Sequence, residues 1–233
     1  MIAENLKQLQ ERILNRCKQA GREPNEIELV AVSKYFGISS IKEAAGAGLT
    51  IFGENKAQEL RDKYEILGDA VNWHFIGSLQ KNKVKYVVNA ASLIHSVDSI
   101  ELADEINKRA AMKNKIQEIL IEIKTSPEAT KSGLIGEEDI YSIAGHCNSL
   151  QNVNLKGLMT MAPYTEDEQI IRKSFSHLRK LKDEFNKQGY NLTVLSMGMT
   201  SDFEIAIDEG SNMLRIGSAI FGNRDYSKDW RSI

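Results

Sequence analysis

Eight short β-rich runs alternate with helical patterns along the chain, and this alternation limits the possible folds more than any other feature of the sequence. Strands that alternate with helices form parallel sheets, because each helix returns the chain to the edge where the last strand began. Eight such units in 233 residues predict a closed (β/α)8 TIM barrel with an extra N-terminal helix, as a single α/β domain over 1–233. An open, doubly wound sheet is the alternative, although no GxGxxG segment follows any strand.

The element boundaries follow from the periodicity of the apolar residues. The N-terminal helix is predicted over 3–20, where Leu6, Leu9, Ile13 and Leu14 share one face. The predicted strands cover 28–33, 49–53, 71–77, 92–97, 116–123, 153–159, 192–197 and 212–217. The clearest later helices cover 38–47, 55–67, 98–113 and 166–188, and a shorter one lies near 80–88.

Composition excludes several classes of function. The net charge of −2 favours neither nucleic acid nor an anionic membrane as a partner. No apolar run approaches 18 residues, and the N-terminal segment has the mixed charge of a helix rather than a signal peptide. Cys17 and Cys147 have no CxxC partner and fit a reducing compartment, and no metal-ligand spacing occurs. We expect a cytoplasmic protein, a monomer, with no metal.

A lysine ends the first predicted strand, where an apolar run gives way to Lys34. The carboxyl ends of the strands form the active-site face of a (β/α)8 barrel. A lysine there either extends its ammonium group to water or performs chemistry. The last strand ends near Arg215, which is either a ligand contact or a member of a structural ion pair.

Two loops at the same face are suited to binding an anion. The segment SMGMTSD over 196–202 and the segment RIGS over 215–218 place glycines and hydroxyl groups after the last two strands. A phosphate site in these two loops is a recurrent feature of such barrels. Ordinary strand–helix turns also contain Gly and Ser and are the alternative, although two such loops together favour the anion site.

A phosphate site and a strand-end lysine in one cavity indicate a phosphorylated carbonyl compound held as a Schiff base. Two ligands fit this description: a pyridoxal phosphate cofactor, or the sugar-phosphate substrate of an aldolase. Arg215 distinguishes them only slightly, because an arginine can face the pyridine nitrogen of the cofactor or hold a phosphate.

Eight sequence blocks, in order along nearly the whole chain, resemble the pyridoxal-phosphate homeostasis proteins of the YggS/PROSC type. The most specific is WHFIGSLQKNK at 73–83. The others are AVSK at 31–34, FGEN with QEL at 52–60, HSVDS at 95–99, EATKSGL at 128–134, GLMTMAP at 157–163, LSMGMTSDFEIAI at 195–207 and RIGSAIFG at 215–222.

The resemblance implies a barrel similar to the N-terminal domain of alanine racemase, with pyridoxal 5'-phosphate (PLP, a vitamin B6 form) as its cofactor. It implies that Lys34 forms the Schiff base and that Arg215 faces the pyridine nitrogen. Neighbours of the cofactor would be Asn55, His74 and Met199. The phosphate would lie against Ser196, Thr200, Gly217 and Ser218.

The function that the resemblance implies is PLP homeostasis, in which the protein carries or regulates the cofactor pool and supplies PLP-dependent apo-enzymes. No robust catalysis is expected, because the chain ends soon after the eighth strand, without a second domain to supply a catalytic tyrosine. A low-activity PLP-dependent racemase-like enzyme is the alternative, and the Schiff-base aldolase stands behind it.

Overall fold

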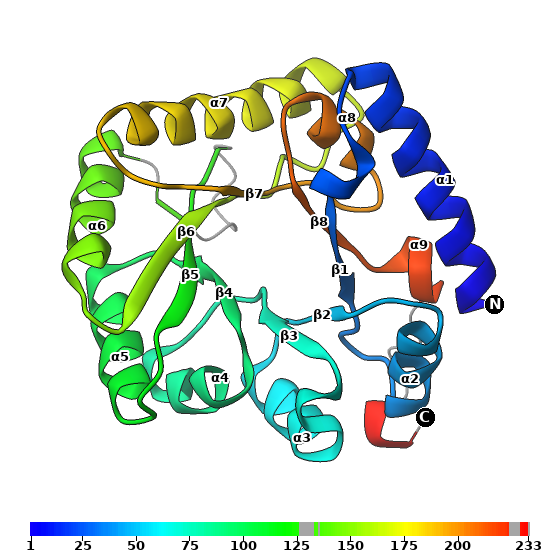
Figure 1. Cartoon of the computed structure of the whole chain (residues 1–233), viewed down its shortest axis with the longest axis horizontal. Helices are drawn as coiled ribbons and strands as arrows, with labels where there is room; N and C mark the ends of the chain where they lie inside the picture. Colours follow the sequence, from blue (N-terminus) through cyan, green and yellow to red (C-terminus); the bar gives the residue numbers. More distant parts are fainter. Residues whose placement is uncertain (126–132, 135, 224–228, 233) are drawn as a thin grey trace.

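The computed structural model describes residues 1–125, 133–134, 136–223 and 229–232. Eight parallel strands pair in chain order, and β1 pairs with β8, so that the sheet closes into a barrel (Figure 1). The predicted fold class is therefore confirmed. The strands are β1 (Glu28–Val32), β2 (Ile51–Glu54), β3 (Asn72–Phe75), β4 (Leu93–Val97), β5 (Gln117–Glu122), β6 (Val153–Met159), β7 (Val194–Ser196) and β8 (Met213–Ile216).

All eight predicted strands are present, and most of their ends differ from the prediction by one or two residues. β7 is the shortest of the described strands: it is predicted to begin at residue 192 and begins at Val194. The reason is a side chain: the amide of Asn186 bonds both the N–H and the carbonyl of Leu192, at 2.8 and 2.9 Å. The block EATKSGL lies almost entirely outside the described residues.

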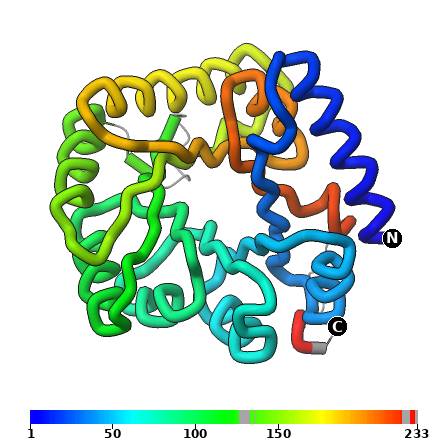
Figure 2. The backbone as a smooth tube through the Cα atoms, viewed as in Figure 1, coloured from blue at the N-terminus to red at the C-terminus, as the bar shows by residue number. Residues whose placement is uncertain are grey.

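Helices surround the barrel, and the chain passes once around the ring from its N-terminal to its C-terminal end (Figure 2). They are α1 (Ile2–Ala20), α2 (Ile38–Gly46), α3 (Ala57–Leu67), α4 (Val84–Ala90), α5 (Ile100–Ala111), α6 (Glu137–Ser149), α7 (Glu168–Lys187), α8 (Phe203–Asp208) and α9 (Ser218–Phe221). A 3-10 turn over Lys81–Lys83 precedes α4, where one short helix was predicted. None of these helices in the described chain is long and apolar enough to cross a membrane.

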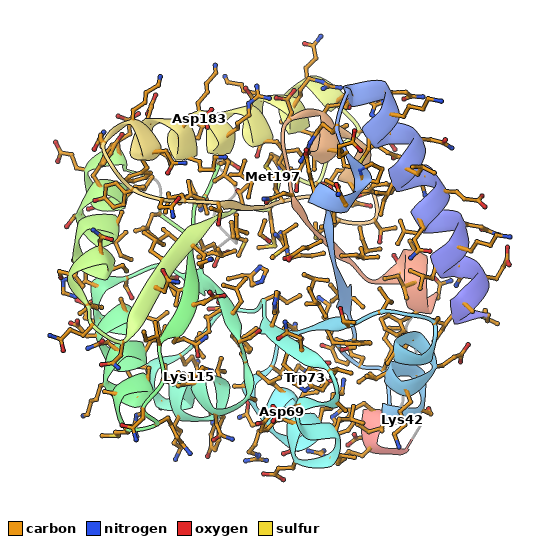
Figure 3. All side chains as sticks on the ribbon, viewed as in Figure 1. Lys42, Asp69, Trp73, Lys115, Asp183 and Met197 are labelled. Atoms are coloured by element: carbon orange, nitrogen blue, oxygen red, sulfur yellow. The ribbon has the colours of Figure 1, made fainter. Side chains whose placement is uncertain are left out.

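Apolar side chains form two layers. The larger layer lies between the strands and the helices, and a smaller cluster fills the barrel interior with Val30, Leu93, Leu120, Met159 and Met213. Side chains project from the strands both into the ring and outward toward the helices (Figure 3). The interior is therefore a packed core, as in other (β/α)8 barrels.

The extra helix α1 packs against the last part of the barrel, beside α8 and α9 (Figure 1). It buries Leu6, Leu9 and Ile13, whereas Leu14, predicted on the same face, is exposed. Arg12 donates two hydrogen bonds to Glu204 of α8, at 3.0 and 2.8 Å. Since α8 follows the SMGMTSD loop, α1 supports one of the two loops predicted to bind an anion.

Candidate functional site

A cavity of about 540 Å³ opens at the carboxyl ends of the strands. We call it the carboxyl-end cavity. It lies where the active sites of (β/α)8 barrels are found. Seven of the nine residues predicted from the sequence line it, and they come from opposite ends of the chain: Lys34, Asn55, Met199, Thr200, Arg215, Gly217 and Ser218.

The structure places the other two predicted residues elsewhere. Ser196 is fully buried at the end of β7, below the cavity. His74 lines a second cavity, of about 390 Å³, which also contains Asn72 and Glu28 at the amino ends of their strands. We call this the amino-end cavity. The physical reason is the pleat: in β3 the inward residues are Asn72, His74 and then Ile76, and only Ile76 reaches the carboxyl-end cavity.

Lys34 follows β1 and is half-buried at the cavity wall. The next residue, Tyr35, has a backbone φ of 69°, in the left-handed region that a bulky residue rarely adopts. Such a conformation persists only where neighbouring contacts hold it. The backbone beside Lys34 is therefore under local constraint.

A buried charge cluster supplies that constraint, and we call it the Lys63 cluster: Lys63, Glu54 and Glu59. The Lys63 ammonium donates to Glu54 Oε1 at 2.7 Å, to Glu59 Oε1 at 2.8 Å and to the carbonyl of Ser33 at 2.9 Å. The Tyr35 amide donates to Glu59 Oε1 at 2.8 Å, on the other side of Lys34. The cluster thus holds the backbone both before and after Lys34.

The Lys63 cluster contains two carboxylates and one ammonium group, all buried. Burial raises the pKa of Glu54 to about 7, and Glu59 adds to this while Lys63 opposes it. Glu54 Oε2 has no hydrogen-bond partner within the described chain. A proton on that oxygen would relieve the excess negative charge of the cluster.

Arg215 is the buried cation of the cavity. Its Nη1 donates to the carbonyl and the Oγ of Ser196, at 2.7 and 2.6 Å, and its Nη2 donates to the carbonyl of Thr160 at 2.9 Å. Burial lowers its pKa to about 10, although Asp202 and Glu122 oppose this shift. Arginine has five N–H donors, so the described contacts leave N–H groups for a ligand.

The two loops predicted to bind an anion meet beside Arg215. The hydroxyl of Ser218 donates to Thr200 Oγ1 at 3.2 Å. Gly198, earlier in the same loop, has φ of 98°, and a Cβ there would lie 2.6 Å from the Cβ of Ala206. Both its conformation and its surroundings therefore require glycine. Two hydroxyl groups in a cavity that Lys34 and Arg215 also line give this site the chemistry to bind a phosphate.

Asn55 contributes an unsatisfied polar atom. Its Oδ1 is buried, lies in a residue that lines the cavity, and has no hydrogen-bond partner among the residues described. The backbone at this position is tightly packed, since a Cβ on Gly77 would lie 2.2 Å from the carbonyl oxygen of Asn55. A buried acceptor without a donor indicates a partner outside the chain, such as water or a ligand.

Three features of the candidate site were not predicted from the sequence. Glu122 and Tyr164 line the carboxyl-end cavity, and the Lys63 cluster lies behind its lysine. The end of the fifth strand was a signal for Glu122, which is its last residue. For Lys63 the Glu59–Lys63 spacing of four within a helix was the available signal, but such pairs are normally on the surface.

Two histidines inside the barrel form a buried pair. His74 Nδ1 lies 3.1 Å from His95 Nε2, and His95 Nδ1 lies 2.9 Å from Ser196 Oγ. Burial lowers the pKa of His74 to about 3 and lowers that of His95 well below its ordinary value. Both rings are therefore neutral at pH 7.

The buried pair of His74 and His95 predicts that acid destabilises the folded protein. A folded pKa below the unfolded value means that the stabilising contribution is present above about pH 6.5 and is lost as the pH falls toward 3. We expect His74→Gln to reduce the loss of unfolding free energy between pH 6.5 and 4.5 by roughly 1.4 kcal/mol per pH unit. Urea unfolding across this range is the measurement, and an identical slope in the variant would contradict the assignment.

Together these features define a (β/α)8 barrel with a lysine at its strand ends and a cavity whose chemistry suits a phosphate group. The family model of the alanine racemase N-terminal domain matches residues 2–225, and the chain belongs to this family. The pyridoxal phosphate homeostasis protein of Aquifex aeolicus is 44% identical over 226 residues, covering 96% of this chain and 98% of that protein.

Two solved structures place the fold in context. PipY of Synechococcus elongatus, solved with PLP bound, is 33% identical and has a TM-score of 0.84, covering 95% of this chain and all of that one. An alanine racemase of Clostridium difficile has a TM-score of 0.74 at 18% identity, and this chain covers 61% of its length. The second likeness concerns the fold alone.

Proposed function

We propose that this protein binds PLP in the carboxyl-end cavity, holds it as a Schiff base on Lys34, and maintains the intracellular pool of the cofactor. The observation that carries the proposal is the joint placement of Lys34, Arg215 and the hydroxyl-bearing loops around one cavity. The bound PLP in PipY and the name of the Aquifex relative support the same assignment.

The residues fit the chemical groups of PLP. An N–H of Arg215 suits the unprotonated pyridine nitrogen as an acceptor, because arginine stays protonated at pH 7. Thr200, Gly217 and Ser218 would hold the phosphate group. Asn55 and Met199 would flank the cofactor. Buried Asn55 Oδ1 can accept a hydrogen bond from a ligand hydroxyl.

The covalent step requires only the amine and the aldehyde. Lys34 would hold the cofactor through its Nζ amine, which would condense with the aldehyde group and release one water molecule. When bound, the cofactor supplies an electron-withdrawing ring to any amine condensed with it. The protein contributes the position of Lys34, which the Lys63 cluster fixes through Ser33 and Tyr35.

The cavity favours a carrier over a racemase. A two-base racemase needs a second proton donor held on the face of the cofactor opposite its lysine. Tyr164 is the tyrosine that lines the cavity in the described part of the chain, and 96% of it is exposed. No packing of Tyr164 therefore holds its hydroxyl toward Lys34.

We further propose that the 233-residue chain acts as one unit, a cytoplasmic monomer that delivers PLP to apo-enzymes. The two cysteines are free and buried, as suits a reducing compartment. Sedimentation velocity tests the monomer, and a concentration-independent dimer would contradict it. Transfer to a PLP-free aminotransferase, followed by recovery of its activity, tests delivery.

The proposal as a whole is tested on the wild-type protein. We expect a visible absorption band after PLP is added, loss of that band with borohydride, and a phosphopyridoxyl group on the Lys34 peptide by mass spectrometry. Failure to take up PLP would overturn the proposal. Conversion of an amino acid to its enantiomer would favour the racemase, and retro-aldol cleavage without a chromophore would favour the aldolase.

A further inference from the structure

Four side chains form a continuous polar chain through the barrel, and the proposed cofactor site lies at one end of it. Arg215 bonds Ser196 Oγ at 2.6 Å, Ser196 Oγ lies 2.9 Å from His95 Nδ1, and His95 Nε2 lies 3.1 Å from His74 Nδ1. Arg215 lines the carboxyl-end cavity, and His74 lines the amino-end cavity. This series of hydrogen-bonded side chains therefore connects the two ends of the barrel.

The direction of the hydrogen bonds follows from the donors available. Arginine can only donate, so Ser196 Oγ accepts from Arg215. Ser196 is fully buried, and besides Arg215 the polar atom that its Oγ contacts among the described residues is His95 Nδ1. The serine proton must therefore go to His95 Nδ1, because a buried hydroxyl without an acceptor is costly.

The direction of the serine hydrogen bond determines the tautomer of both histidine rings. If Nδ1 of His95 accepts, its Nε2 carries the proton and donates to His74 Nδ1. His74 in turn carries its proton on Nε2, an atom with no hydrogen-bond partner in the described chain. The reverse direction would leave the Ser196 proton unpaired, and a protonated ring would place a second buried cation near Arg215.

We propose that His95 is a positioning residue which, with His74, holds Ser196 as an acceptor for Arg215 and so sets the orientation of the guanidinium group. Both rings are neutral tautomers protonated at Nε2. The effect of His95 on the cofactor rests on the proposed function. The tautomers of the two rings do not depend on that function. His95 is buried and does not line the carboxyl-end cavity, so it acts only through Ser196.

Nuclear magnetic resonance on the ligand-free protein tests the tautomers. The chain has four histidines, and His146→Gln together with His177→Gln leaves only the buried pair visible. Long-range nitrogen–proton spectra separate a protonated ring nitrogen from a bare one. We expect Nε2 protonated in both rings from pH 8 to pH 5. A proton on Nδ1 of His95, or a cationic ring at pH 7, would overturn the inferred direction of these hydrogen bonds.

A matched pair of substitutions tests the positioning role. His95→Gln keeps one acceptor and one donor at a spacing similar to that of the ring, whereas His95→Leu removes both. We expect His95→Leu to weaken PLP binding about tenfold and to shift the absorption band, and His95→Gln to restore both. Equal spectra and affinities for the two variants would refute the role.

The two tests separate the possible failures. PLP binding with the wrong tautomers would remove the inference and leave the proposed function intact. The expected tautomers without any uptake of PLP would remove the proposed function and leave the polar chain established. If His95→Leu fails to fold, the spectra of the protein with its native His95 still decide the direction of the chain.

Discussion

Lys34→Ala loses the covalent adduct completely. The variant, incubated with PLP and then reduced with borohydride, shows the unmodified intact mass, because no other lysine lines the carboxyl-end cavity in the described chain. Arg215, Thr200 and Ser218 still line the cavity of the variant. PLP therefore still binds, with an affinity roughly 100-fold lower, which corresponds to about 2.7 kcal/mol.

Lys56→Ala is the matched control for this experiment. Lys56 lies close to the same loop, with its Nζ 4.5 Å from the centre of the Tyr35 ring, yet it is exposed and does not line the cavity. This variant keeps the reducible band and the modified Lys34 peptide. A phosphopyridoxyl group that persists in Lys34→Ala at wild-type yield would show that another lysine forms the bond.

Lys63→Met has the largest expected effect on stability. The substitution keeps the length of the side chain but leaves Glu54 and Glu59 buried without a cation. Removing one partner of a buried ion pair costs about 3–5 kcal/mol. Urea unfolding at pH 8 measures the loss, and Lys7→Met on the exposed face of α1 is the control, with a change within about 0.5 kcal/mol.

Acid reduces the effect of Lys63→Met. Glu54 already has a pKa of about 7 in the folded protein, above its ordinary value of 4.5, so protonation stabilises the fold as the pH falls between these values. Without Lys63 the tendency of Glu54 to bind a proton increases, because Lys63 lowers the pKa of this carboxyl group. The difference between variant and wild type is therefore smaller at pH 5.5 than at pH 8. A loss below 1 kcal/mol at pH 8 would show that the cluster contributes little.

The sequence predicted the parts of the site that depend on strand ends. Lys34 and Arg215 could be located because a barrel brings the carboxyl ends of its strands together, whatever their distance along the chain. The loop containing Thr200 could be located because Gly198 marks a turn whose backbone conformation residues with a side chain rarely adopt. These inferences need only the order and the polarity of the elements.

Depth within the barrel could not be predicted in the same way. His74 and Ser196 belong to strands whose apolar pattern shows an inward face, but the stagger between strands decides which layer each residue occupies. The pairing of His74 with Leu93, the first residue of β4, places it toward the amino end. Lys63 was missed because its burial depends on Glu54, which lies on another element and is brought to it only by the fold.

The pairing of β1 with β8 has a consequence for how the protein acquires its site. Val30 lies opposite Arg215 across this seam, so the first and last strands of the barrel bring Lys34 and Arg215 to the same cavity. A nascent chain still lacking β8 has the lysine without the arginine. A ligand stabilises the state that binds it. A ligand that contacts both Lys34 and Arg215 would therefore stabilise the barrel that the pairing of β1 with β8 closes. Cofactor loading would then report that synthesis and closure are complete.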